Sequence, residues 1–223
     1  MKDNIKIASG QGFWGDLISA PLDQVTAGEI DYLVMDYLAE VTMSIMQKQK
    51  NKNPEMGYAR DIPELMRVLL PHLAEKRIKV ITNGGGVNPE ACAKVVKEIA
   101  DEMGLSIKVA VVTGDNILSS LDELIAAGAE LKNMETGEPI SRVKDELMSA
   151  NVYLGAFPIV DALQLGADII ITGRTTDTGL TLAPMIYEFG WSQTDFDLLS
   201  AGTVAGHILE CGAQASGGNF LGD

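Results

Sequence analysis

Basic residues and long apolar runs are scarce in this sequence. Its 223 residues include 17 lysines and arginines against 31 aspartates and glutamates, which gives a formal net charge of -14. Such an acidic chain lacks the basic footprint that binding to nucleic-acid phosphates requires, so we expect no nucleic-acid partner. No stretch approaches the ~20 consecutive apolar residues of a transmembrane helix, so we expect no membrane span.

Cysteine is also scarce, with only Cys92 and Cys211 present. Two thiols do not make the disulfide framework that stabilises small secreted domains. The first residues contain no apolar core of a signal peptide, and they run directly into a predicted strand. We therefore expect a cytoplasmic protein with reduced thiols, long enough to bury an ordinary hydrophobic core.

What the sequence does contain is an alternation of short β-branched runs with segments of helical apolar spacing. This alternation predicts an α/β fold, namely a doubly wound, mostly parallel sheet of about six strands with helices on both faces. The fold is expected to occupy residues 1–194 as a Rossmann-like domain. Residues 195–223, a helix with a glycine-rich tail, are expected to start a second region or to form an interface. The predicted strands are 5–9, 32–36, 79–82, 107–112, 151–155 and 169–171.

A charged pair follows the last predicted strand, where the chain turns into a helix. Three isoleucines at 169–171 lead to Gly173, and Arg174 and Asp177 come directly after it. In open α/β sheets, ligands bind outside the carboxyl ends of the strands. Arg174 is therefore predicted to bind an anionic group by a bidentate contact. The alternative is that Arg174 pairs with Asp177 and only fixes the start of the helix.

A glycine-rich turn follows the first predicted strand. Its sequence matches G-x-G-x-x-G, and Asp36 ends the second predicted strand about 20 residues later. Dinucleotide-binding units use such glycines to approach a pyrophosphate and such an acid to hold a ribose. Gly10, Gly12, Asp16 and Asp36 are accordingly predicted to bind a ligand. A proline within the expected crossover helix favours the alternative, a tight loop that only leaves the sheet edge.

The third predicted strand ends in a second glycine-rich turn. Asn83 is followed by Gly84, Gly85 and Gly86, and a helix with proline at its first position begins at Pro89. A loop without side chains lets backbone N–H groups reach a ligand, and a helix N-terminus favours an anion. These four residues are predicted to contact the ligand, and the alternative is a flexible turn.

The last predicted helix, over 198–213, carries a histidine, a carboxylate and a thiol. His207, Glu210 and Cys211 are spaced as i, i+3 and i+4, which places them on one face of a helix. Such a group can transfer protons, and His207 and Glu210 are predicted to be catalytic. The alternative is a buried histidine paired with an acid beside a structural cysteine. No metal is predicted, because the sequence offers no second cluster of ligands.

Residues 205–220, A-G-H-I-L-E-C-G-A-Q-A-S-G-G-N-F, resemble the signature of the acyclic terpene utilisation A family. Segments 10–16, 36–42, 83–86 and 173–177 are similar to further motifs of that family, in the same order. Family members are usually longer and continue past the G-G-N-F element, so the resemblance implies an N-terminal portion with a missing part that can be a separate chain. The family is named for gene clusters that degrade citronellol and geraniol through acyl-CoA intermediates.

Together these features predict a cytoplasmic catabolic enzyme acting on a small carboxylic acid or its CoA thioester by lyase or hydratase chemistry. Arg174 would hold a carboxylate, and His207, Glu210 and Asp177 would serve as the catalytic groups. The alternatives are a nucleotide- or CoA-binding subunit without a complete active site and an NAD-dependent oxidoreductase. No particular cofactor is predicted. Small and apolar residues crowd 198–213, so a homo-oligomer or a partner subunit is expected.

Overall fold

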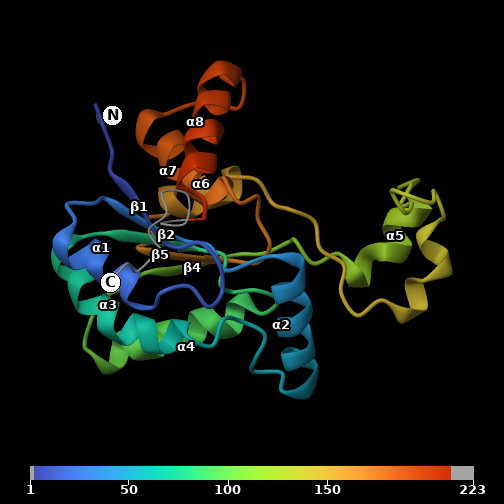
Figure 1. Ribbon diagram of the computed structural model, residues 1–223, viewed down its shortest axis with the longest axis horizontal. Coiled ribbons are helices and arrows are strands. Elements are labelled where there is room, and N and C mark those ends of the chain that lie inside the picture. Colours follow the sequence, from blue (N-terminus) through green and yellow to red (C-terminus); the bar gives the residue numbers. More distant parts are fainter. Residues whose placement is uncertain (1–2, 212–223) are drawn as a thin grey trace, which may run out of the picture.

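The computed structural model describes residues 3–211, in which five parallel strands form one sheet (Figure 1). The spatial order is β1-β2-β3-β5-β4, and every neighbouring pair is parallel. This confirms the predicted α/β fold with a parallel sheet, although β1 lies at an edge. In the dinucleotide-binding order 3-2-1-4-5-6 the first strand is central. The strands are β1 (Ile7–Gln11), β2 (Tyr32–Met35), β3 (Lys79–Thr82), β4 (Val109–Val112) and β5 (Ile169–Thr172).

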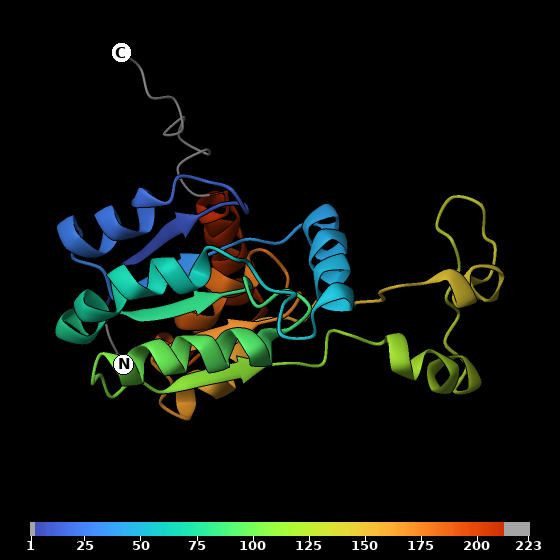
Figure 2. The same ribbon diagram turned by 90° about the horizontal axis from the view of Figure 1, so that it is seen from below.

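Helices cover both faces of the sheet, as predicted (Figures 1 and 2). One face carries α1 (Ser19–Ala27), α3 (Ile62–Lys76) and α4 (Pro89–Glu102). The other carries α6 (Phe157–Gln164) and α7 (Gly179–Phe189), and α8 (Phe196–Leu209) packs on α7. The remaining long helix, α2 (Glu40–Lys52), stands beyond the carboxyl ends of the strands. No helix among the described residues is long and apolar enough to cross a membrane.

Two hydrophobic cores lie on opposite faces of the sheet because successive strand residues point to opposite sides. Leu33 and Met35 of β2 pack in the core beneath α3 and α4, while Tyr32 and Val34 pack in the core beneath α6 and α7. Every residue of β2 and of β5 is buried. Strands that are covered on both faces have continuous apolar runs, which is why the sequence located both of them.

The predicted strand at 151–155 is wrong. Its residues make only isolated bridges, from Asn151 to Asn116 and from Leu154 to Thr175, and they do not join the sheet. The Asn151 side chain instead donates a hydrogen bond to Asp115, 2.8 Å away. The segment lies past the carboxyl ends of β4 and β5, where no strand edge is left to pair with, so its β-branched and aromatic residues do not produce a strand.

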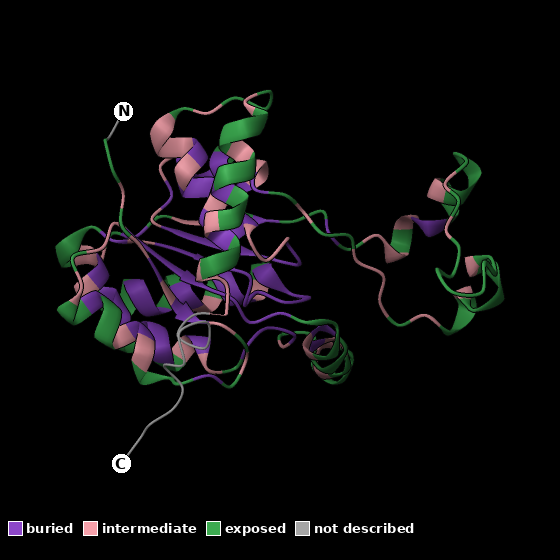
Figure 3. Cartoon of the chain, turned by 45° about the horizontal axis from the view of Figure 1, so that its top comes forward, coloured by how far each residue is buried: buried purple, intermediate pink, exposed green. Residues whose placement is uncertain are grey.

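Residues 117–150, called the arm below, project away from the sheet (Figures 1 and 3). The arm contains α5 (Leu121–Ala126) and the short 3-10 turns Leu118–Ser120, Ile140–Arg142 and Lys144–Glu146. Leu121 is the only buried residue of the arm, all of which the structure describes. The arm connects β4 to the segment that leads into α6, so its two ends lie beside the carboxyl edge of the sheet.

The last helix ends earlier than the sequence predicts. α8 stops at Leu209, because Glu210 is extended with a ψ of 153° and Cys211 has a left-handed φ of 63°. The glycine-rich tail at 212–223 lies outside the described residues. Its predicted role as an interface, and the proposed division of the chain at residue 195, therefore stay predictions.

Candidate functional site

A pocket of about 420 Å³ lies at the carboxyl edge of the sheet. Loops after β1, β2 and β5 meet there, because parallel strands all end on the same side. Its volume is in the range of small-molecule sites. A wider hollow of about 680 Å³ lies at the opposite edge, where most of its lining residues are exposed, so we assign no site to it. The lining of the first, called the carboxyl-edge pocket, is Gly12, Phe13, Trp14, Asp36, Tyr37, Leu38, Ala39, Glu40, Thr42, Arg174, Asp177 and Glu210.

Asp36, the first residue after β2, is the most deeply buried carboxyl group of the pocket. Its Oδ1 accepts hydrogen bonds from Nδ2 of Asn83 at 2.7 Å and from the backbone N–H of Leu38 at 3.1 Å. Burial raises the pKa of the Asp36 carboxyl to about 6, despite these two bonds. Oδ2 takes no partner from the described residues, so it is the oxygen left for a proton or a ligand. Asp36 can therefore exchange a proton near neutral pH.

Asn83, predicted to contact a ligand, is fully buried and lies between two loops. Its Oδ1 accepts the backbone N–H of Tyr37 at 2.8 Å, while its Nδ2 donates to Asp36. Both polar atoms of the amide are thus used inside the protein. Asn83 fixes the orientation of the Asp36 carboxyl and does not line the carboxyl-edge pocket.

The three glycines after Asn83 are buried and also lie outside this pocket. A Cβ at Gly84 would come within 2.4 Å of Ile62 Cδ1, and one at Gly85 within 2.6 Å of the Thr172 carbonyl oxygen. Gly86 has a left-handed φ of 57°. Close packing and backbone conformation account for these glycines, so the loop needs no ligand to explain its composition.

The first glycine turn is closed by a side chain. Asp16 accepts hydrogen bonds from the N–H groups of Gly12 and Leu17, at 3.1 and 2.7 Å. A Cβ at Gly12 would lie 2.4 Å from the backbone of Cys211, so the chain itself covers the face of this glycine. A Cβ at Gly10 would come within 3.0 Å of Leu33 Cδ1, a side-chain atom. With β1 at the edge of the sheet, no observation favours a dinucleotide here.

Arg174 is buried, with its side chain only 5% exposed. One nitrogen of the guanidinium, Nη1, donates to the backbone oxygen of Leu38 at 3.0 Å and to Oδ1 of Asp177 at 2.9 Å. The backbone N–H of Arg174 donates to Asp115 at 2.9 Å. The two alternatives for Arg174 are therefore compatible, because it pairs with Asp177 and also lines the carboxyl-edge pocket.

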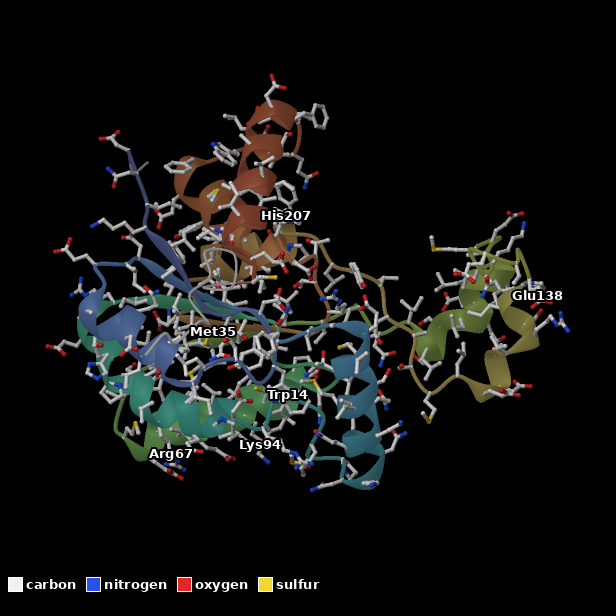
Figure 4. The ribbon with its side chains drawn as sticks, in the orientation of Figure 1. Trp14, Met35, Arg67, Lys94, Glu138 and His207 are labelled. Carbon is white, nitrogen blue, oxygen red and sulfur yellow. The ribbon has the colours of Figure 1, made fainter. Side chains whose placement is uncertain are left out.

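The three predicted catalytic residues have different positions. Asp177 and Glu210 line the pocket, whereas His207 is exposed on α8 and does not (Figure 4). The interpretation that His207, Glu210 and Cys211 share a helix face is wrong, because α8 ends at Leu209. The Cys211 thiol donates to Glu210 at 3.0 Å, and this bond raises the pKa of the thiol to about 11. No group of three potential metal ligands occurs within residues 3–211.

Two residues that the sequence did not single out lie against Arg174. The guanidinium carbon stands 4.1 Å from the centre of the Tyr153 ring, and Oε1 of Glu40 lies 3.9 Å from Nη2 of Arg174. The Tyr153 hydroxyl donates to the same carboxylate of Glu40. Glu40 belongs to the segment 36–42 that resembles a family motif, which was the available signal. Tyr153 gave none, because its partner lies 113 residues away.

Comparison with models of protein families gives a match. The model of the family described as "Acyclic terpene utilisation family protein AtuA" matches residues 5–223. No curated protein and no solved structure matches the chain. The family match covers the whole carboxyl-edge pocket.

Proposed function

The chain belongs to the acyclic terpene utilisation family AtuA, and we propose that it adds water to, or removes water from, a small carboxylic acid or its CoA thioester. The observation that carries this proposal is Asp36. It is a buried carboxyl group with a pKa of about 6 and one unpartnered oxygen, and it shares a pocket with a buried arginine. A carboxyl group poised in this way can act as general base in one direction and as general acid in the other.

In the hydration of an α,β-unsaturated acid, Asp36 Oδ2 takes a proton from water as the water oxygen bonds to the β-carbon. The electrons of the C=C bond move toward the carboxyl group, and Asp36 returns the proton to the α-carbon. Arg174 would stabilise the negative charge that develops on the carboxyl or thioester oxygen. Asp177 holds Arg174 in place through Nη1. One molecule of water is consumed, and nothing is oxidised or reduced.

The charges around the pocket support a substrate with a single negative group. Among the described residues, four carboxyl groups line it and Arg174 is the one cation. A second anionic group would meet the acidic side chains, so the free acid fits better than a thioester whose phosphates enter the pocket. The apolar part of the substrate would lie against Phe13, Trp14 and Leu38; Figure 4 labels Trp14.

The proposal is tested by incubating the protein in D₂O with branched α,β-unsaturated acids and with their CoA thioesters. Mass spectrometry would detect hydration and deuterium at the α-carbon. We expect turnover of at least one member, and we expect Asp36→Asn to lower the rate by about 10²–10⁴-fold, the range for loss of a general acid–base group. An absence of turnover across the panel, or full activity of Asp36→Asn, would overturn the proposal.

A further inference from the structure

We propose that Glu40 is an internal stand-in for the carboxylate of the substrate. A ligand carboxylate would displace it and bind along the Nε–Nη2 edge of Arg174. Tyr153 would be a positioning residue that keeps the guanidinium plane in place. This inference rests on the proposed function, because it concerns the anion-binding part of the same pocket.

The Nε–Nη2 edge of Arg174 is the unused side of the guanidinium. Nη1 already donates to Leu38 and Asp177. Nε is buried and has no hydrogen-bond partner among the described residues. At Nη2, the Glu40 oxygen at 3.9 Å is too far for a hydrogen bond. Nε and Nη2 form the parallel pair of donors that a carboxylate accepts in a bidentate contact. A buried charged donor without an acceptor is costly, which favours an acceptor from outside the protein.

Glu40 can leave this place easily. It is the first residue of α2, and its side chain is 77% exposed. An exposed ion pair at this distance contributes little to stability, so a ligand that makes two hydrogen bonds can replace it. The Tyr153 hydroxyl holds the Glu40 carboxylate and lowers its pKa, so Glu40 stays ionised at neutral pH and competes for the cation.

Tyr153, in contrast, is anchored from both sides. The backbone N–H of Leu154 donates to the backbone oxygen of Arg174 at 3.1 Å. The backbone N–H of Val152 donates to the backbone oxygen of Asp115 at 2.7 Å. Since Asp115 also accepts the N–H of Arg174, the backbone around Tyr153 is fixed relative to the arginine. The ring therefore stays over the guanidinium when Glu40 moves. The ring covers the face of the guanidinium, so a carboxylate binds along the edge that carries Nε and Nη2.

The test is calorimetric titration at low salt with 3-methylbutanoate, an unreactive branched monocarboxylate. Glu40→Gln removes the competing charge, and we expect it to lower the Kd by about two- to fivefold. Glu64→Gln is the matched control, because Glu64 is an exposed glutamate in the first turn of α3 and does not line the pocket. We expect the control to leave the Kd unchanged.

Two variants of Tyr153 separate positioning from structure. Tyr153→Phe keeps the ring and frees Glu40, so we expect the Kd to fall as it does in Glu40→Gln. Tyr153→Leu removes the aromatic face under the guanidinium, so we expect the Kd to rise about three- to tenfold. A purely structural role for Tyr153 would shift both variants in the same direction, which would overturn the positioning role.

The outcomes distinguish the two proposals. If 3-methylbutanoate binds the wild type and its Kd is the same for Glu40→Gln and Glu64→Gln, the stand-in role is overturned while the proposed function stands. If the acid binds neither the wild type nor Glu40→Gln, both the stand-in role and the anion-binding role of Arg174 are overturned. The D₂O assay of Asp36→Asn then decides separately whether proton transfer remains.

Discussion

Asn83 donates a hydrogen bond of 2.7 Å to Asp36, and so joins the loops that follow the neighbouring strands β2 and β3. Its other polar atom holds the backbone of Tyr37, so the amide has no freedom to turn. This pair defines the catalytic centre that we propose. One residue supplies the proton-exchanging carboxyl group, and the other fixes its direction.

Replacing Asn83 with alanine should raise the pKa of Asp36 above about 6, because the bond from Asn83 lowers it in the wild type. The variant should also lose about 1–3 kcal/mol of unfolding free energy, since it leaves Tyr37 N–H without its buried acceptor. Urea unfolding and the pH profile of turnover measure the two effects. Asn4→Ala, at an exposed position outside the helices and strands, is the control. An unchanged profile would show that Asn83 does not tune Asp36.

Asp36→Asn should stabilise the protein at neutral pH while it lowers the rate of the proposed reaction. A carboxyl group whose pKa is raised on folding contributes stability below its unfolded pKa and loses it as pH rises through its folded pKa. For a shift from 3.8 to about 6, the loss between pH 4 and pH 7 is about 2 kcal/mol. The variant keeps a side-chain oxygen that can accept the hydrogen bond from Asn83. Because its amide does not ionise, the variant does not lose stability in this way as the pH rises. Unfolding curves at both pH values measure the difference, and parallel pH dependences would contradict the assignment.

Arg174→Lys should weaken binding of 3-methylbutanoate by about tenfold or more, because lysine keeps the charge and loses the planar fork. Its partner variant, Asp177→Asn, should weaken binding less, since Leu38 still holds Nη1. For both variants, binding is measured by calorimetry and stability by thermal unfolding. Equal losses of stability with unchanged binding would mean that the pair is only structural.

Gly12→Ala should destabilise the protein by about 1–3 kcal/mol, through the clash of its Cβ with the backbone of Cys211. Gly155→Ala is the matched control, because nothing lies within 4 Å of a Cβ at that position. Both are compared by urea unfolding without any ligand. If Gly12→Ala is as stable as the control, the packing explanation for this glycine fails, and its role as a ligand contact gains weight.

The sequence predicts the strands that are buried on both faces of the sheet. The apolar runs at 79–82 and 169–171 coincide with β3 and with most of β5, because covered parallel strands leave a continuous pattern. The segment 151–155 also contains β-branched and aromatic residues and is no strand, because strand formation depends on a neighbouring edge that the sequence does not show. The end of α8 was missed for a similar reason, since the backbone of Cys211 lies against Gly12, a long-range contact that the sequence does not show.

The site was predictable in part. Asp36, Arg174 and Asp177 were selected because they follow predicted strands, and Glu210 from helical spacing; all four line one pocket. Their roles were less visible, because the pKa of Asp36 depends on burial and on Asn83. His207 was selected from helical spacing alone, and exposure on α8 separates it from the pocket. The contact of Tyr153 with Glu40 depends on the path of the arm, which no local pattern encodes.

We propose above all that Asp36 exchanges a proton near neutral pH. Titration of the protein labelled with ¹³C at aspartate carboxyl groups tests it directly and requires no substrate. The Asp36 resonance is assigned as the one missing from Asp36→Asn. We predict a midpoint near pH 6 for this resonance, whereas a midpoint near the ordinary value of about 3.9 would contradict the account.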